Sequence, residues 1–105
     1  MPHLEIKYSN DIDLDVNVLF EGIEALINVL DPSAGVCKSR AYPSLNFRNS
    51  HVMVDLWLLP KPHRDSAFTQ SLLNGIKGCV MKQIPKSCYV SLQLYYRDAN
   101  YLTIE

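Results

Sequence analysis

The sequence predicts an α+β fold in which two βαβ repeats form a four-stranded mixed sheet with two helices on one face. Two observations support this prediction. Segments in which apolar and polar residues alternate, as in strands, are interspersed with two segments whose apolar residues recur at three- and four-residue spacing, as in helices. The order strand, helix, strand, short strand then occurs twice along the chain. In each βαβ unit the two main strands should be parallel and joined by a right-handed crossover, which places both helices on the same face.

The first half begins with a strand at residues 3–8, followed by a helix of about four to five turns. Asp13 is expected as the N-cap of this helix, with Asp15 in its first turn. The loop at residues 31–35 contains a proline and a glycine and should end the helix. The inward-facing stripe is formed by Val16, Leu19, Phe20, Ile23, Ile27 and Leu30.

The second strand is expected at residues 36–42, where Lys38 and Arg40 share one face. Pro43 should interrupt this strand, because proline cannot donate a ladder hydrogen bond. Residues 45–47 then form a candidate short edge segment before a turn at residues 48–50. The two pseudo-repeats of the chain therefore cover about residues 1–49 and 50–105.

The second half repeats this order, beginning with a strand at residues 51–59 whose even-numbered residues from Val52 to Leu58 are apolar. A stiff basic loop at residues 60–64 leads to a helix capped by Asp65 or Ser66. Glycines 75 and 78 make the middle of that helix less certain. A last main strand at residues 89–96, a turn at 97–100 and a second short edge strand at 101–104 complete the chain. The inward residues of the second helix are expected to be Phe68, Leu72, Leu73, Ile76, Cys79 and Val80.

The face of the sheet without helices should be polar, with charges of both signs and two aromatic rings. Such a face is either solvated or packed against another subunit, and the two short edge segments would suit pairing with a neighbour's sheet. We therefore expect an oligomer. The residues of this open face are His3, Glu5, Lys7, Lys38, Arg40, Met53, Asp55, Trp57, Ser91, Gln93 and Tyr95.

Length, charge and cysteine content exclude several classes of function. The chain of 105 residues is expected to be a single domain, residues 1–105, and its net charge of −1 argues against nucleic acid or an anionic membrane as partner. No apolar run is long enough to span a bilayer and the first residues lack a signal-peptide pattern, so we expect a cytoplasmic protein. The three cysteines have no CxxC spacing, which favours reduced thiols over a disulfide framework or a metal site.

The start of the chain carries the main candidate for chemistry. Met1 precedes a small residue and would normally be removed, so that Pro2 begins the chain as a free secondary amine at the head of a strand. Burial and nearby cations both lower the pKa of an amine toward the range in which it acts as a base near neutral pH. Alternatively, Pro2 is only a stiff strand start.

Three segments resemble the 5-carboxymethyl-2-hydroxymuconate delta-isomerases of the tautomerase superfamily, which also includes 4-oxalocrotonate tautomerase and macrophage migration inhibitory factor. They are residues 1–4 with Tyr8-Ser9, residues 34–36, and Lys38-Ser39-Arg40. The element order agrees along nearly the whole chain, whereas the motif match is confined to the first nine residues and the second strand. The resemblance implies a tautomerase-like homotrimer, a role in the catabolism of aromatic compounds, and catalysis without a metal or organic cofactor.

The resemblance further implies that Pro2 is the catalytic base of an isomerase acting on an unsaturated 2-hydroxy or 2-oxo carboxylic acid. Arg40 and Lys38 match the family's basic second strand and would bind the substrate's carboxylates. Pairing of these cations with Glu5 or Asp55 across the sheet is an equally good reading. Arg64 and Lys61, in the loop before the second helix, are weaker substrate-binding candidates, with a role as solvated loop charges as the alternative. Trp57, Phe47 and Tyr95 are candidates for the pocket wall, with core or interface packing as the alternative.

Two alternatives to this function remain. The same element order is used by ferredoxin-like RNA-recognition and small-ligand regulatory domains. The third strand lacks the basic-Gly-aromatic pattern of an RNA-recognition motif, but a regulatory or binding module fits the element order. The other alternative is a tautomerase-like trimer without catalytic activity.

Overall fold

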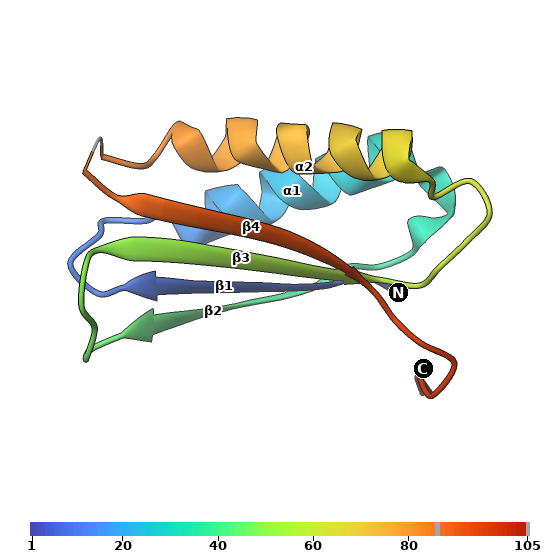
Figure 1. Ribbon diagram of the computed structural model, residues 1–105, viewed down its shortest axis with the longest axis horizontal. Coiled ribbons are helices and arrows are strands. Elements are labelled where there is room, and N and C mark those ends of the chain that lie inside the picture. The colour runs from blue at the N-terminus through green and yellow to red at the C-terminus, as the bar shows by residue number, and fades with distance from the viewer. Residues whose placement is uncertain (86, 105) are drawn as a thin grey trace.

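The computed structural model, which describes residues 1–85 and 87–104, has the predicted α+β architecture. Four strands form one sheet in the order β2-β1-β3-β4, and both helices cover the same face (Figure 1). The predicted fold class is confirmed. The elements are β1 (His3–Ser9), α1 (Val16–Leu30), the 3-10 helix η1 (Pro32–Ala34), β2 (Lys38–Ser44), β3 (His51–Leu58), α2 (Ser66–Met81) and β4 (Tyr89–Tyr96).

The pairing of the strands separates this fold from the ferredoxin-like alternative. β1 is parallel to β2 and β3 is parallel to β4, while the two central strands β1 and β3 are antiparallel. Each βαβ unit therefore has its two strands side by side. The ferredoxin-like fold uses split βαβ units, in which the two strands of a unit are not neighbours, so the ferredoxin-like topology is not that of this chain.

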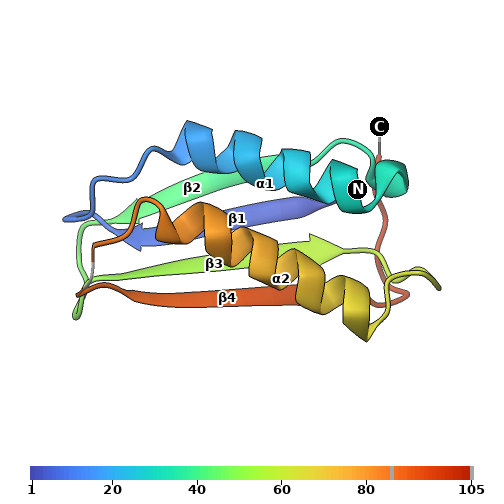
Figure 2. The ribbon, with the colours of Figure 1, turned by 90° about the horizontal axis from the view of Figure 1, so that it is seen from above.

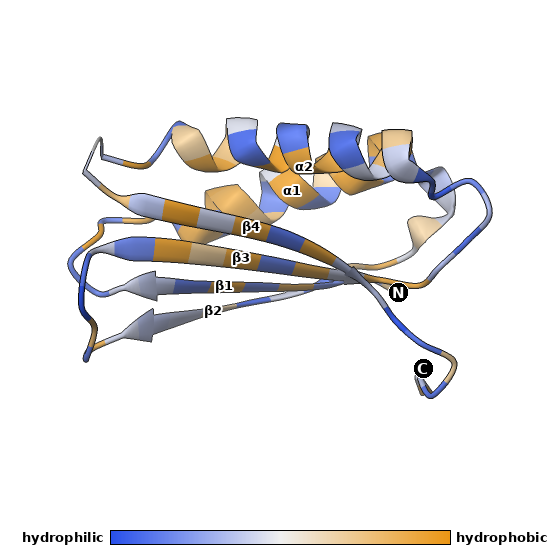
Figure 3. Ribbon diagram, in the orientation of Figure 1, coloured by the Kyte–Doolittle hydropathy of each residue, from blue (hydrophilic) through white to orange (hydrophobic). Residues whose placement is uncertain are grey.

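The core lies between the sheet and the two helices, as the alternating residues predict. The register pairs Leu4 with Leu56 and Ile6 with Val54, so these side chains point together toward the helices. Figure 3 shows the resulting alternation of apolar and polar bands along β3 and β4, and Figure 2 shows α1 on the β2 side and α2 on the β4 side of the sheet. The fully buried side chains are Leu4, Ile6, Leu19, Ile23, Ile27, Val52, Val54, Leu56, Leu58, Leu72, Ile76 and Val80. Among the described residues, neither helix is long and apolar enough to cross a membrane.

The ends of the predicted elements needed correction at α1 and β2. Asp15, not Asp13, is the N-cap of α1, where its Oδ1 accepts a hydrogen bond from the Val18 N–H at 3.2 Å. Strand β2 begins at Lys38 and continues through Pro43 to Ser44, although Pro43 was expected to interrupt it. The prediction was wrong because β2 is an edge strand, where a residue without an N–H can face away from the only neighbouring strand. At α2 the prediction of Asp65 as the cap is confirmed.

Neither of the two predicted short edge strands forms within the described chain. Residues 45–47 lie in the bend between β2 and β3, and residues 101–104 have no strand conformation. The two segments lie beyond the ends of β2 and β4, and neither pairs with a strand of the described chain. Leu45, Leu102 and Ile104 remain 77%, 86% and 89% exposed, respectively.

Two glycines of α2 allow a matched stability test. Gly78 faces open space, so Gly78→Ala is expected to stabilise the protein by about 0.5–1 kcal/mol through helix propensity. A Cβ at Gly75 would overlap the side chain of Leu26, which is partly buried against the core. Gly75→Ala is therefore expected to destabilise the protein relative to Gly78→Ala, as measured by urea unfolding. Equal stabilisation by both substitutions would contradict the close approach of α1 and α2 at Gly75.

Candidate functional site

Pro2 is buried at the corner of the sheet where β1 starts. Its carbonyl accepts a hydrogen bond from the Lys38 N–H at 2.9 Å, which ties it to the beginning of β2. On the other side, His3 is paired with Trp57 near the end of β3. Because β1 is parallel to β2 and antiparallel to β3, the starts of β1 and β2 and the end of β3 meet at this corner. Residues from both halves of the chain surround the N-terminus.

The surroundings of the N-terminus disfavour a positive charge. The terminal amine, which in this structure belongs to Met1, has a pKa below its ordinary value of 8.0. Burial is the largest cause, and the remaining contributions come from the cations Lys38, Arg64, Lys61 and Arg97, in that order. An amine at this corner is therefore held toward its neutral form, which is the form that can accept a proton.

Arg64 is committed to a buried ion pair at the edge of this corner. Its Nε and Nη2 lie 2.8 and 2.7 Å from Oδ2 of Asp31, and its Nη1 donates to the Leu59 carbonyl at 2.7 Å. The Asp31 carboxylate also accepts from the Ser33 N–H and hydroxyl and contacts Nε2 of His63 at 2.9 Å. Burial raises the pKa of Asp31, but the hydrogen bonds from Ser33, His63 and Arg64 outweigh it and hold that pKa well below its usual range. Arg64 therefore influences the N-terminus through its charge, while its hydrogen bonds go to the protein.

Arg40 and Lys38 lie on the open face beside β1. Nη2 of Arg40 is 3.4 Å from Oε1 of Glu5, which is the cross-sheet pairing that the sequence also allowed. Nη1 of Arg40 is 3.4 Å from Nδ1 of His3. The exposed Lys38 places its Nζ 2.7 Å from the Met1 sulfur. Both cations are thus near the start of β1, and the one on Lys38 faces the residue that precedes Pro2.

The three aromatic candidates are not brought together within one chain. Trp57 and Tyr95 face each other across β3 and β4, with ring centroids 4.0 Å apart and planes at 11°. Phe47 lies in the loop between β2 and β3, at the end of the sheet opposite to Pro2. Of these three aromatic residues, Trp57 and Tyr95 lie toward the end of the sheet that carries Pro2, and Phe47 does not.

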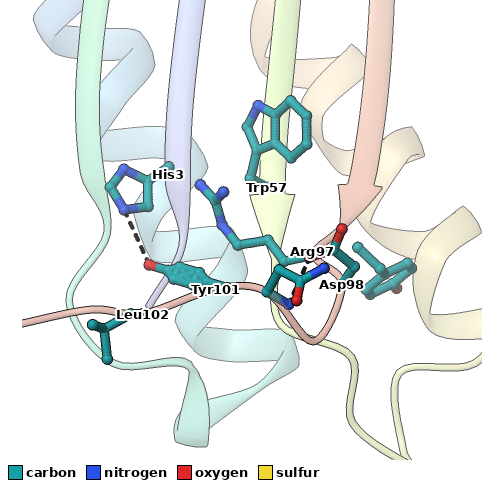
Figure 4. Close-up of a pocket in the computed structure, with 8 residues that line it drawn as sticks. His3, Trp57, Arg97, Asp98, Tyr101 and Leu102 are labelled. Carbon is teal, nitrogen blue, oxygen red and sulfur yellow. Dashed lines mark hydrogen bonds between the residues drawn. The ribbon is translucent and has the colours of Figure 1, made fainter.

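A pocket of about 540 Å³ opens beside this corner, beneath the segment that follows β4. Its lining includes His3, Trp57, Arg97 and Tyr101. The Arg97 guanidinium lies 5.2 Å from the Trp57 ring centroid and 4.4 Å from that of Tyr101. The Tyr101 hydroxyl is 3.5 Å from Nε2 of His3, so the tail reaches from β4 back to β1 (Figure 4).

Arg97, Tyr101 and His3 were not among the predicted site residues. The sequence contains a signal for Arg97: side chains of β4 alternate between the two faces, and residue 97, two positions after Tyr95, falls on the same face as Tyr95. Tyr101 could not, because its position depends on the path of the tail across the end of the sheet. Among residues 1–85 and 87–104, no group of three or more His, Cys, Asp or Glu side chains is placed to hold a metal ion.

Comparisons with solved structures identify the fold of this chain. No protein-family model matches the chain, and no curated protein matches it in sequence. Solved structures do match it: a 5-carboxymethyl-2-hydroxymuconate delta-isomerase aligns with 100% of this chain and 88% of its own at 17% identity and a TM-score of 0.76. The 5-carboxymethyl-2-hydroxymuconate isomerase from Deinococcus radiodurans R1 gives a TM-score of 0.85 at 13% identity over 98% of this chain and 88% of its own. A fused 4-OT wild type symmetric trimer gives 0.79 at 10% identity over 98% of this chain and 93% of its own.

The chain therefore has the fold of the tautomerase superfamily. Its structure is similar to those of the 5-carboxymethyl-2-hydroxymuconate isomerases and of fused 4-OT, as the sequence motifs suggested. At these identities the likeness establishes the fold.

Proposed function

We propose that this protein is a cofactor-independent isomerase or tautomerase that moves a proton on an unsaturated 2-hydroxy or 2-oxo carboxylic acid. In this proposal Met1 is removed and the secondary amine of Pro2 is the base. The observation that carries the proposal is the environment of the N-terminus: Pro2 is buried, and burial and four cations lower the pKa of the adjacent Met1 amine. Two solved structures with the same fold are named as isomerases, which supports the same class of reaction.

The chemistry requires one poised base and positive charge around it. Moving a double bond in a keto acid takes a proton from one carbon and returns it to another, and a single amine can do both. The dienolate intermediate carries negative charge, which nearby cations stabilise. Lys38 and Arg40 are proposed to bind the substrate. Arg64 is held in the ion pair with Asp31, and its positive charge helps to lower the pKa of the N-terminal amine. Trp57 and Tyr95 are proposed as walls, and Phe47 could reach the pocket only from a neighbouring subunit.

Assembly as a homotrimer is part of the proposal. The fused 4-OT with this fold is described as a symmetric trimer. In this chain β2 and β4 are both edge strands, and the open face between them carries the half-exposed Met53 and Tyr42. These unpaired edges and the exposed Leu45 would be covered by neighbouring subunits. Sedimentation equilibrium at several concentrations would measure the mass, and a monomer at all of them would rule out the trimer.

The test of the proposed base compares protein with a free and with a blocked Pro2 nitrogen. Intact mass first verifies which residue starts the chain. Ketonisation of 2-hydroxymuconate and of phenylenolpyruvate is then followed by ultraviolet absorbance for chain beginning at Pro2 and for the same chain with that nitrogen acetylated. Activity is expected only with the free amine, because an amide nitrogen cannot accept the proton. Equal rates for both forms, or no activity in either, would refute the proposed function.

A further inference from the structure

We infer that Arg97, held between Trp57 and Tyr101, is a receptor for the carboxylate of a small planar, conjugated acid. The pocket and the two aromatic contacts of Arg97 are independent of the proposed reaction. The further step, in which the bound acid is also the substrate whose proton Pro2 moves, rests on the proposed function.

The first argument is the way in which Arg97 is held. Its backbone N–H donates to the Leu58 carbonyl at 2.8 Å, which continues the pairing of β3 and β4 by one residue. Its guanidinium lies over two aromatic rings, at 5.2 Å from Trp57 and 4.4 Å from Tyr101. Figure 4 shows the side chain passing between these rings toward His3. Stacking on aromatic faces fixes a guanidinium plane without using its N–H donors.

The second argument is that these donors lack partners within the described chain. The Nε atom of Arg97 is buried with no hydrogen-bond partner, and Arg97 forms no salt bridge with any residue in 1–85 or 87–104. The nearby Asp98 also lines the pocket, but its Oδ1 accepts the Asn100 N–H at 2.9 Å. The buried Nε is out of reach of the pocket, so a carboxylate there would bind the two Nη groups at the end of the planar fork in a bidentate manner.

The third argument is the shape and position of the pocket. Its walls include the flat rings of Trp57, Tyr101 and His3, which suit a planar conjugated ligand. His3 directly follows Pro2. After burial, the charge of Arg97 is the largest cause that lowers the pKa of the His3 imidazole, and Arg97 is the last of the four cations that lower the pKa of the Met1 amine. An acid bound to Arg97 would therefore extend toward Pro2. In this arrangement Arg97 would hold the carboxylate of the acid, and the Pro2 amine would lie beside its unsaturated carbons.

The test uses sorbate, a conjugated dienoate that lacks the hydroxyl and keto groups of the proposed substrates, and its neutral counterpart 2,4-hexadien-1-ol. Trp57 is the only tryptophan of the chain, so its fluorescence reports binding in this pocket without any turnover. Sorbate is expected to change the fluorescence in a saturable way that weakens with added salt. The alcohol should bind at least ten times more weakly.

Three variants locate the carboxylate contact. Arg97→Met is expected to weaken sorbate binding by roughly ten- to a hundred-fold, the range for loss of a charged hydrogen-bonding partner. Arg97→Lys should recover only part of this loss, because lysine keeps the charge but not the planar fork. Arg48→Met, at the opposite end of the sheet, is the matched control and should bind sorbate as the parent protein does. Thermal unfolding of each variant checks that the fold is kept.

The inference is overturned if sorbate gives no saturable change, if the alcohol binds as tightly, or if Arg97→Met binds sorbate normally. The first two comparisons use the unmodified protein and remain decisive if Arg97→Met does not fold. Pro2→Ala separates this inference from the proposed function. Sorbate binding should persist in Pro2→Ala, so a chain that binds sorbate through Arg97 but has no ketonisation activity would support the anion site and refute the reaction.

Discussion

Replacing Pro2 with alanine is expected to lower kcat/KM for the ketonisation of phenylenolpyruvate by about 10²- to 10⁴-fold, the usual contribution of a general base. Alanine at the start of the chain keeps an amine, but this primary amine is no longer fixed by a ring at the buried head of β1. Misplacing a base by a small distance removes most of its effect. Pro62→Ala, in the exposed loop before α2, is the matched control and should leave the rate unchanged.

The pH dependence of kcat/KM is a second test of Pro2 as the base. Only the neutral amine accepts a proton, so kcat/KM should rise with pH as the amine loses its charge. Burial and the cations lower the pKa of the Met1 amine from its ordinary value of 8.0, and we expect the same surroundings to centre this rise below the ordinary pKa of a free N-terminal proline. If Pro2→Ala retained the full rate with the same pH profile, Pro2 would not be the base.

Replacing Asp31 with asparagine is expected to destabilise the protein by about 3–5 kcal/mol, the usual cost of leaving one member of a buried ion pair without its partner. The side chains of Asp31 and Arg64 are 3% and 2% exposed, so the guanidinium of Arg64 could not reach water after the substitution. The same carboxylate also accepts hydrogen bonds from Ser33, which fix η1 beneath the N-terminal corner. Urea unfolding at neutral pH measures the loss.

Two comparisons test the origin of this effect. Asp13→Asn removes an exposed carboxylate and should change stability by less than about 0.5 kcal/mol. The double variant Asp31→Leu with Arg64→Met removes both charges and should recover much of the stability lost in Asp31→Asn. A double variant as unstable as Asp31→Asn would show that the charge of Arg64 is not the cause.

The lowered pKa of Asp31 fixes the direction of the pH dependence. A carboxyl whose pKa is lower in the folded state stabilises the fold above its unfolded-state pKa, and this contribution is lost as the pH falls through the folded-state value. The difference in stability between the parent protein and Asp31→Asn should therefore be full at neutral pH and shrink below 3.8, the ordinary value. A difference that stayed constant in acid would argue against a buried carboxylate.

Most of the fold could be predicted because the strands and helices of this chain carry clear periodic patterns. The four apolar residues from Val52 to Leu58 are all buried, and β4 has the predicted bounds of Tyr89–Tyr96. The errors occur where an element depends on its neighbours. Pro43 is tolerated because β2 has a partner on one side only, whereas residues 101–104 lie beyond the end of β4 and pair with no strand of the sheet.

The candidate site was predictable to a smaller extent. Pro2, Lys38 and Arg40 could be proposed from a short motif, and the structure places them at one corner, where their roles stay predictions. The sequence predicts Arg64 as a weaker substrate-binding candidate or a solvated loop charge, whereas its side chain is buried against Asp31, a partner 33 residues away in sequence. No local pattern reports such a pair, because it depends on how the loop before α2 meets the end of α1.

The sequence by itself determined the order of the elements, the two faces of the sheet and the presence of a proline at the head of the first strand. These properties follow from local spacing, since the side chains of a strand alternate and those of a helix recur with its turn. Only the tertiary structure decided which cations surround the N-terminus and that Arg97 lies between Trp57 and Tyr101. Those contacts join β1, β3 and the segment after β4, and their geometry is set by strand pairing and by the path of the chain across the end of the sheet.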